Sequence, residues 1–398
     1  MRKLLTALAL LVCLAAPAQA ASSADIMALN AEKGTLADGI VAITGNDAES
    51  RAARGTLKFL QAIEHAAQAL HRHGLEIRSG ARMGLPILRL PVPPNPHPEP
   101  LDYAKFRAIF EGVVTDLNAA EADLKEVGDQ PVKLPLDLMK LRIDMDGDGK
   151  ASDYESVAAI IGDLNRSENP AAAVVAFDTA DIYWLRGYSH FLVGFSQFLL
   201  AHDFKDMFDK TFHVYFPNAG LPYASQLSRG LAQDMFVNDD VGDVIAMIHL
   251  INWKVVEPAR RKDSRAQLLA MADLSRKSWA AARAEADNDR EWLPNAKQTG
   301  AFGGPPVDDE VIDGWLAVMG EFEAVLEGKK LLPHWRFNEG LNLKRFFDEG
   351  QNFDLVLMIA GVDSVPWLEQ GTVSDATTWN NLMGVFRGNF LGYALWFN

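Results

Sequence analysis

The chain has 398 residues, of which 48% are hydrophobic and 23% are charged, and its formal net charge is −15. A chain of this length can bury a large hydrophobic core, and its single cysteine, Cys13, excludes a fold held together by disulfides. The acidic excess argues against a protein that binds nucleic acid or anionic lipid, because both ligands require a concentrated basic surface.

The first twenty residues have the three parts of an export signal. Arg2 and Lys3 precede an apolar stretch at 4–16, and Ala18-Gln19-Ala20 has the small-residue pattern that signal peptidase reads. We expect cleavage after Ala20 and a mature protein in the periplasm or outside the cell. Loss of two basic residues leaves 36 against 53 acidic ones, a net charge of −17. Because no later segment holds about 18 uninterrupted apolar residues, we expect no transmembrane segment.

Apolar residues at helical spacing dominate the rest of the chain and predict an all-α fold. The predicted helices cover about residues 47–74, 103–128, 178–200, 241–258, 258–282 and 311–328. Strand-like alternation is scarce by comparison. We therefore expect a multi-helical array or bundle, with irregular helical repeats as one form of it. The motif Arg54-Gly55-x-x-x-Phe59-Leu60 recurs as Arg186-Gly187-x-x-x-Phe191-Leu192, which is compatible with such a repeat.

Two irregular stretches and a domain boundary near residue 217 predict the domain organisation. Residues 85–100 contain seven prolines and cannot be helical, and residues 294–306 have the composition of a long loop. We expect a signal peptide at 1–20, an N-terminal helical domain at 21–216 and a C-terminal helical, aromatic-rich domain at 217–398. In the C-terminal domain, the apolar residues 355–362 predict a buried element.

One segment, residues 144–155, has a spacing that dictates a chemistry. Oxygen-bearing side chains stand at positions one, three, five, nine and twelve of a twelve-residue loop, with a glycine, Gly149, at the sharp turn. Calcium prefers six to eight oxygen ligands, which such a loop can wrap around a single ion. The predicted ligands are Asp144, Asp146, Asp148, the backbone carbonyl of Lys150, Ser152 through a bridging water, and Glu155 through both carboxylate oxygens.

With these residues the segment resembles the calcium loop of the EF-hand family. The resemblance implies a helix–loop–helix, with Leu138, Leu141 and Ile143 on the incoming helix, and it implies Ca²⁺ as the bound ion. A trivalent lanthanide is an alternative ion for four carboxylates. EF-hand loops normally occur in pairs, but the acidic residues 287–291 are followed by Trp292 where a second loop would need glycine.

The chain contains no nucleophile elbow, phosphate-binding loop or zinc-binding histidine pair. We interpret it as an exported calcium-binding helical protein, a scaffold or binding module with a structural calcium rather than an enzyme. Its partner would be a protein or an envelope polymer. Two alternatives stay open: a periplasmic hydrolase with its site among the aromatic residues from His334 onward, and a calcium-responsive switch. A concave pocket holding a buried pair of carboxyl groups with shifted pKa values would favour the hydrolase.

Overall fold

The computed structural model describes residues 35–76, 86–165, 174–226, 239–301 and 307–375. The expected export signal and the aromatic residues beyond 375 lie outside this part of the chain. The described residues are mostly helical, which confirms the predicted fold in its coarse form. Their eleven α-helices are α2 (Leu36–Ala42), α3 (Ala48–Arg72), α4 (Tyr103–Lys125), α5 (Val157–Asn165), α6 (Thr179–Leu200), α7 (Lys205–Thr211), α8 (Asp239–His249), α9 (Pro258–Ala284), α10 (Asp309–Leu326), α11 (Leu343–Glu349) and α12 (Leu355–Ala360). Over these ranges, no helix combines the length and the apolar character required to cross a membrane.

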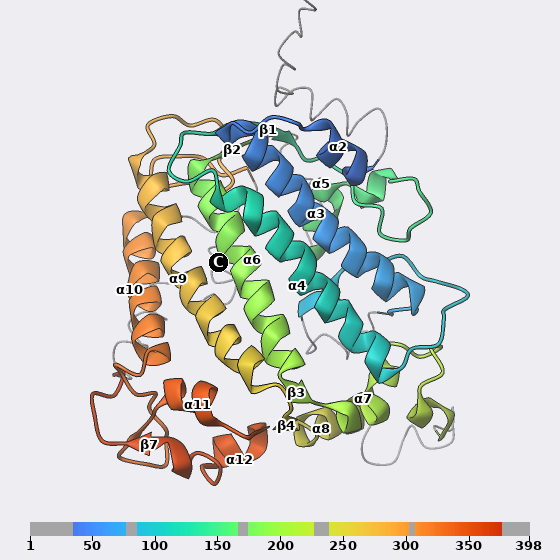
Figure 1. Cartoon of the computed structure of the whole chain (residues 1–398), viewed down its shortest axis with the longest axis vertical. Coiled ribbons are helices and arrows are strands. Elements are labelled where there is room, and N and C mark those ends of the chain that lie inside the picture. Colours follow the sequence, from blue (N-terminus) through green and yellow to red (C-terminus); the bar gives the residue numbers. More distant parts are fainter. Residues whose placement is uncertain (1–34, 77–85, 166–173, 227–238, 302–306, 376–398) are drawn as a thin grey trace, which may run out of the picture.

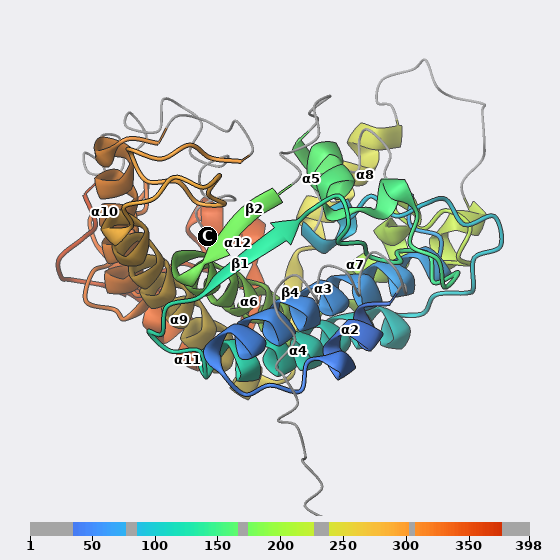
Figure 2. The same cartoon turned by 90° about the horizontal axis from the view of Figure 1, so that it is seen from above.

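The five longest helices lie side by side in chain order and form one curved layer (Figures 1 and 2). Helix α3 packs on α4, α4 on α6, α6 on α9 and α9 on α10. Four of these helices begin at an aspartate whose side chain accepts a hydrogen bond from a main-chain N–H of the first turn, at Asp47, Asp102, Asp178 and Asp308. The fifth, α9, begins with Pro258, as its sequence predicts.

Small residues and ion pairs hold the layer together. A Cβ atom at Gly55 of α3 would lie 2.5 Å from Cγ of Leu124, so α3 and α4 approach each other closely at this glycine. Arg54, next to this glycine on α3, donates a hydrogen bond to Asp123 of α4. Arg186 of α6 donates a hydrogen bond to Glu121, which also lies on α4. The arginines of the two recurring Arg-Gly motifs, on α3 and α6, therefore both bind α4, which lies between these two helices. The predicted helical repeat stays a prediction.

The prediction of an all-α fold is wrong in one respect, because three small β-sheets are present among the described residues. Their strands are only two to five residues long, too short for an alternating pattern to stand out in the sequence. They are β1 (Lys133–Asp137) with β2 (Val174–Asp178), β3 (His202–Asp203) with β4 (Asn252–Val255) and β6 (Asn352–Asp354), and β5 (Gly340–Leu341) with β7 (Leu368–Glu369). Each pair is antiparallel and joins segments far apart in the chain.

The β1–β2 ribbon and α5 lie on one face of the helical layer (Figure 2). In the ribbon Lys133 pairs with Asp178 at one end, and Asp137 pairs with Val174 at the other. The buried core is continuous from α2 and α3 through α4 and α6 to α10. The expected buried element at 355–362 is wrong: α12 lies at the surface, where Ile359 is 61% and Val362 60% exposed. The domain boundary near 217 stays a prediction.

Candidate metal centre

The loop 144–155 is shaped by aspartate side chains that accept hydrogen bonds from its own main chain. Asp144 accepts from the N–H groups of Gly147 and Gly149, at 2.8 and 3.0 Å. Asp146 accepts from Asp148, and Asp148 from Lys150, at 3.0 and 2.7 Å. Gly147 and Gly149 have φ values of +74° and +81°, a region that side-chain-bearing residues rarely adopt. The glycines thus permit the tight winding that turns three carboxylates toward one point.

Three of the predicted ligands are brought together. Carboxylate oxygens of Asp144, Asp146 and Asp148 all lie within 4.8 Å of one another. Two oxygens bound to one calcium ion, each about 2.4 Å from it, are at most about 4.8 Å apart, so a single ion can contact all three side chains. Burial and the nearby negative charges of Glu155, Asp148 and Asp144 raise the pKa of Asp146. A cation between these groups would relieve that repulsion.

The other predicted ligands surround this group in different ways. Glu155 is 1% exposed, and its carboxylate accepts from the N–H of Met145 and from the N–H and hydroxyl of Ser152, at 2.8, 2.8 and 2.6 Å. It stands near enough to Asp146 to raise that residue's pKa. The hydroxyl of Ser152 is thus bonded to Glu155, while Lys150 contributes its N–H to Asp148. Oε1 of Glu155 accepts one hydrogen bond and keeps a lone pair with which to bind an ion, whereas Oε2 accepts both hydrogen bonds from Ser152 and would have to exchange one of them for the ion.

The flanks of the loop correct the expected helix–loop–helix. The incoming segment is strand β1 followed by a turn, because Pro135 disfavours a helix there and residues 133–137 pair with β2. Leu138, Leu141 and Ile143 precede the loop and are buried, but they do not lie on a helix. Two main-chain hydrogen bonds close the loop: Ile143 N–H donates to the carbonyl of Glu155, and Val157 N–H to that of Leu141. The outgoing helix is present as α5, after a single 3₁₀ turn at Asp153–Glu155.

Two residues of α3, far from the loop in sequence, hold its first ligand. Glu64 accepts a hydrogen bond from the N–H of Asp144 at 2.9 Å, and Nε2 of Gln68 donates to the carbonyl of Asp144 at 2.8 Å. Glu64 is 8% exposed, and its pKa is raised by burial and by the charges of Asp144 and Glu155. The sequence reasoning missed both residues. The available signal was a carboxylate on the apolar stripe of α3, between Leu60 and Ala67.

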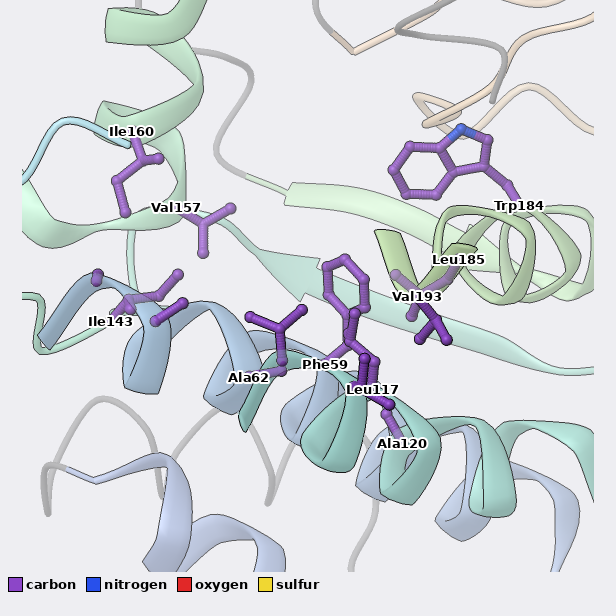
Figure 3. Packing of buried hydrophobic residues seen from close by; sticks show 14 of the residues in the cluster. Phe59, Ala62, Leu117, Ala120, Ile143, Val157, Ile160, Trp184, Leu185 and Val193 are labelled. Atoms are coloured by element: carbon purple, nitrogen blue, oxygen red, sulfur yellow. The ribbon is translucent and has the colours of Figure 1, made fainter. Parts of the chain in front are cut away.

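Apolar contacts fix the loop on the same helix. Figure 3 shows Ile143 before the loop and Val157 and Ile160 after it gathered beside α3, near Ala62. All four side chains belong to the main buried cluster and are less than a tenth exposed. The loop is therefore fastened to the helical layer on both sides of its acidic group.

A second acidic group lies where β2 meets α6. Carboxylate oxygens of Asp178, Glu285 and Glu291 lie within 4.8 Å of one another, and Asp181 is buried next to them. Glu291 comes from the segment 287–291, which the sequence had ruled out as a second calcium loop. Lys133 of β1 pairs with Asp287 at 2.6 Å and with Asp289 at the edge of this group. The ring of Trp292 lies 5.8 Å from Phe177 and 5.1 Å from Trp184.

The acidic side chains of this second group are shifted toward their neutral forms. Burial and the charge of Asp178 raise the pKa of Glu285 to about 8, and the two side chains share a hydrogen bond. Burial also raises the pKa of Asp178 and of Glu291, and it raises that of Asp181 most strongly, aided by Asp178. A carboxyl pair that holds one proton near neutral pH can act as an acid and a base.

The aromatic residues from His334 onward are divided between core and surface. Phe346 and Phe347 are buried in a small cluster beside Phe353 and Trp367, whereas Trp335 is 77% exposed. Six other aromatic residues of this region lie outside the described residues: Trp379, Phe386, Phe390, Tyr393, Trp396 and Phe397. The shifted carboxyl pair of Asp178 and Glu285 stands away from this region in the sequence. Comparison with protein-family models, curated proteins and solved structures finds no match for this chain, so its function is argued from the geometry of these sites.

Proposed function

We propose that this chain is an exported protein in which the loop 144–155 binds one calcium ion, and that the ion stabilises a helical scaffold or binding module. The observation that carries the proposal is the convergence of Asp144, Asp146 and Asp148 within 4.8 Å. The carbonyl of Lys150, a water held by Ser152, and Glu155 would complete six to eight oxygen ligands. The partner of the scaffold would be a protein or an envelope polymer.

A structural role for the ion follows from the connections of the loop. Its hydrogen bonds and apolar contacts reach α3, α5 and the turn that follows β1, so an ion that draws the loop together also holds these three parts of the fold. At a calcium concentration one hundred times the dissociation constant, such binding adds about 2.7 kcal/mol to the free energy of unfolding. Calcium is plentiful outside the cytoplasm, so an exported site of this kind would stay filled.

The test is thermal unfolding of the mature protein after removal of calcium by a chelator and then during titration with calcium, with magnesium as a control. We expect a calcium-specific rise in melting temperature with an unchanged helical signal. The double variant Asp146→Asn, Asp148→Asn should lose this rise. Asp153→Asn should keep it, because Asp153 lies in the same loop but bonds Arg142 at the surface. A wild-type protein indifferent to calcium would refute the proposal, and a calcium-dependent change of shape would replace the scaffold with a switch.

The Asp178–Glu285 pair favours a second candidate, a hydrolase that acts on envelope polymers. Glu285, protonated at neutral pH, would donate a proton to a leaving group, and Asp178 would activate water. Hydrolysis of peptidoglycan and polysaccharides by the purified protein is the assay. Activity lost in both Asp178→Asn and Glu285→Gln, but kept when the exposed Glu310 is changed to Gln, would establish this function. A wild-type protein that cleaves none of these polymers would remove it.

A further inference from the structure

The first predicted calcium ligand is held by a helix that lies outside the loop. Asp144 has its N–H bonded to Glu64 and its carbonyl bonded to Gln68, at 2.9 and 2.8 Å. Glu64 and Gln68 are four residues apart on α3, so their side chains project from the same face of that helix. Gln68 also lies beside the loop at Gly147, where an added Cβ would stand 3.6 Å from its Cγ.

Glu64 is unusual because it is a carboxylate placed among other carboxylates. It is 8% exposed and lies close to both Asp144 and Glu155. Buried charges are normally compensated by a partner of opposite sign or by a bound ion. The hydrogen bond from Asp144 places this buried carboxylate beside the first predicted ligand, where a bound cation would offset its charge.

We propose that Glu64 and Gln68 are positioning residues of the cation site, which orient Asp144 from α3 and couple binding of the ion to that helix. This inference rests on the proposed calcium function and goes beyond the twelve-residue loop. Glu64 does not need to touch the ion. Its oxygen holds the N–H of Asp144, and its charge adds to the negative field of Asp144, Asp146, Asp148 and Glu155. Residues behind the metal ligands commonly change metal affinity by about 10- to 100-fold.

The role predicts two effects of opposite sign. Glu64→Gln keeps an oxygen that can accept from Asp144 but removes the charge. It should therefore unfold at a higher temperature than the wild type in chelator, because repulsion from Asp144 and Glu155 is relieved, and yet it should bind calcium more weakly. A residue with a merely structural role would lower the melting temperature in chelator and leave calcium affinity unchanged.

The experiment is calorimetric titration of the chelator-treated mature protein with calcium, together with amide hydrogen exchange of α3. We expect Glu64→Ala to weaken calcium binding by about 10- to 100-fold, Glu64→Gln by less, and Gln68→Ala by about tenfold. The controls are Glu49→Ala, an exposed glutamate of α3, and Gln61→Ala, a glutamine of the same helix; both should bind within twofold of wild type. Calcium should slow exchange in α3 around residues 62–70 in the wild type and less so in Glu64→Ala.

The outcomes separate this inference from the function on which it rests. If the wild type binds calcium, Asp146→Asn with Asp148→Asn abolishes binding, and the Glu64 and Gln68 variants bind within twofold of wild type, the positioning role is overturned and the calcium site stands. If the wild type binds no calcium, both fall. Should Glu64→Ala lose its helical signal, Glu64→Gln and Gln68→Ala decide the matter, because Glu64→Gln keeps the size of the side chain and Gln68→Ala shortens one that is only partly buried.

Discussion

The pKa of Glu285 predicts that this protein loses stability as the pH rises from 5 to 8. Glu285 has a pKa of about 8 when folded, against an ordinary value of 4.5. Because the folded form holds its proton more tightly, the stabilising contribution of the protonated group is complete below pH 4.5 and disappears as the pH rises through 8. The perturbation that isolates this effect is Glu285→Gln, which mimics the neutral side chain at every pH.

The size of the effect follows from the two pKa values. At 1.36 kcal/mol per pKa unit, the interval from 4.5 to about 8 sets an upper limit of about 5 kcal/mol. Glu285 is only partly buried, so screening by solvent reduces the change, and we expect about 2 kcal/mol. Glu285→Gln should therefore be more stable than the wild type by this amount at pH 8 and nearly equal to it at pH 5.

Urea unfolding of the mature protein at pH 5, 6, 7, 8 and 9 in chelator measures the difference without a contribution from calcium. Glu310→Gln is the matched control, since Glu310 is an exposed residue of α10. Its stability should follow that of the wild type over the whole range. The reasoning is refuted if Glu285→Gln and the wild type show parallel stability curves between pH 5 and pH 8.

Three further predictions concern single positions. Arg261→Met should raise the free energy of unfolding, measured by urea titration, by about 1 kcal/mol. Arg261 is 1% exposed, and its guanidinium has no hydrogen-bond partner among the described residues, only the ring of Phe346 at 4.0 Å. A loss of stability would show that this contact with the ring outweighs the cost of burying the charge. Gly149→Ala should weaken calcium binding, measured by calorimetry, by about tenfold, because the φ of +81° at this position strains any other residue by about 1–2 kcal/mol. As a control, Gly112→Ala on the exposed face of α4 should leave calcium binding unchanged and raise the melting temperature slightly. Gly55→Ala should lower stability by about 1–3 kcal/mol, because its Cβ would meet Leu124 at 2.5 Å, and an unchanged melting temperature would contradict the close approach of α3 and α4.

The long helices were predictable because their information is local. Apolar residues at a period near 3.6, aspartates at the starts and Pro258 at the head of α9 are all visible without knowledge of any partner. The strands were not predictable in this way. Residues 133–137 become β1 only because β2, some forty residues later, lies beside them. The same long-range pairing replaces the helix that an EF-hand would have placed before the loop.

The exposure of α12 has a similar explanation. Its sequence, Leu-Val-Leu-Met-Ile-Ala, is apolar at every position, so the pattern contains no polar face to mark a surface helix. Which of its side chains are covered depends on what packs against it. In the described part of the chain α12 contacts α8 and β6, and Ile359 stays exposed.

By itself, the sequence determined the order of oxygen-bearing side chains and glycines in the twelve-residue loop. The ligands of such a loop lie close together in the chain, so their spacing in the sequence already sets how they are arranged around an ion. It also determined the long helices, through local periodicity and capping. Only the tertiary structure decided that Glu64 and Gln68 stand behind Asp144, and that Asp178, Glu285 and Glu291 meet in one group. These residues come from segments tens of residues apart, and no local pattern carries the information about which of the many acidic side chains are brought together and buried.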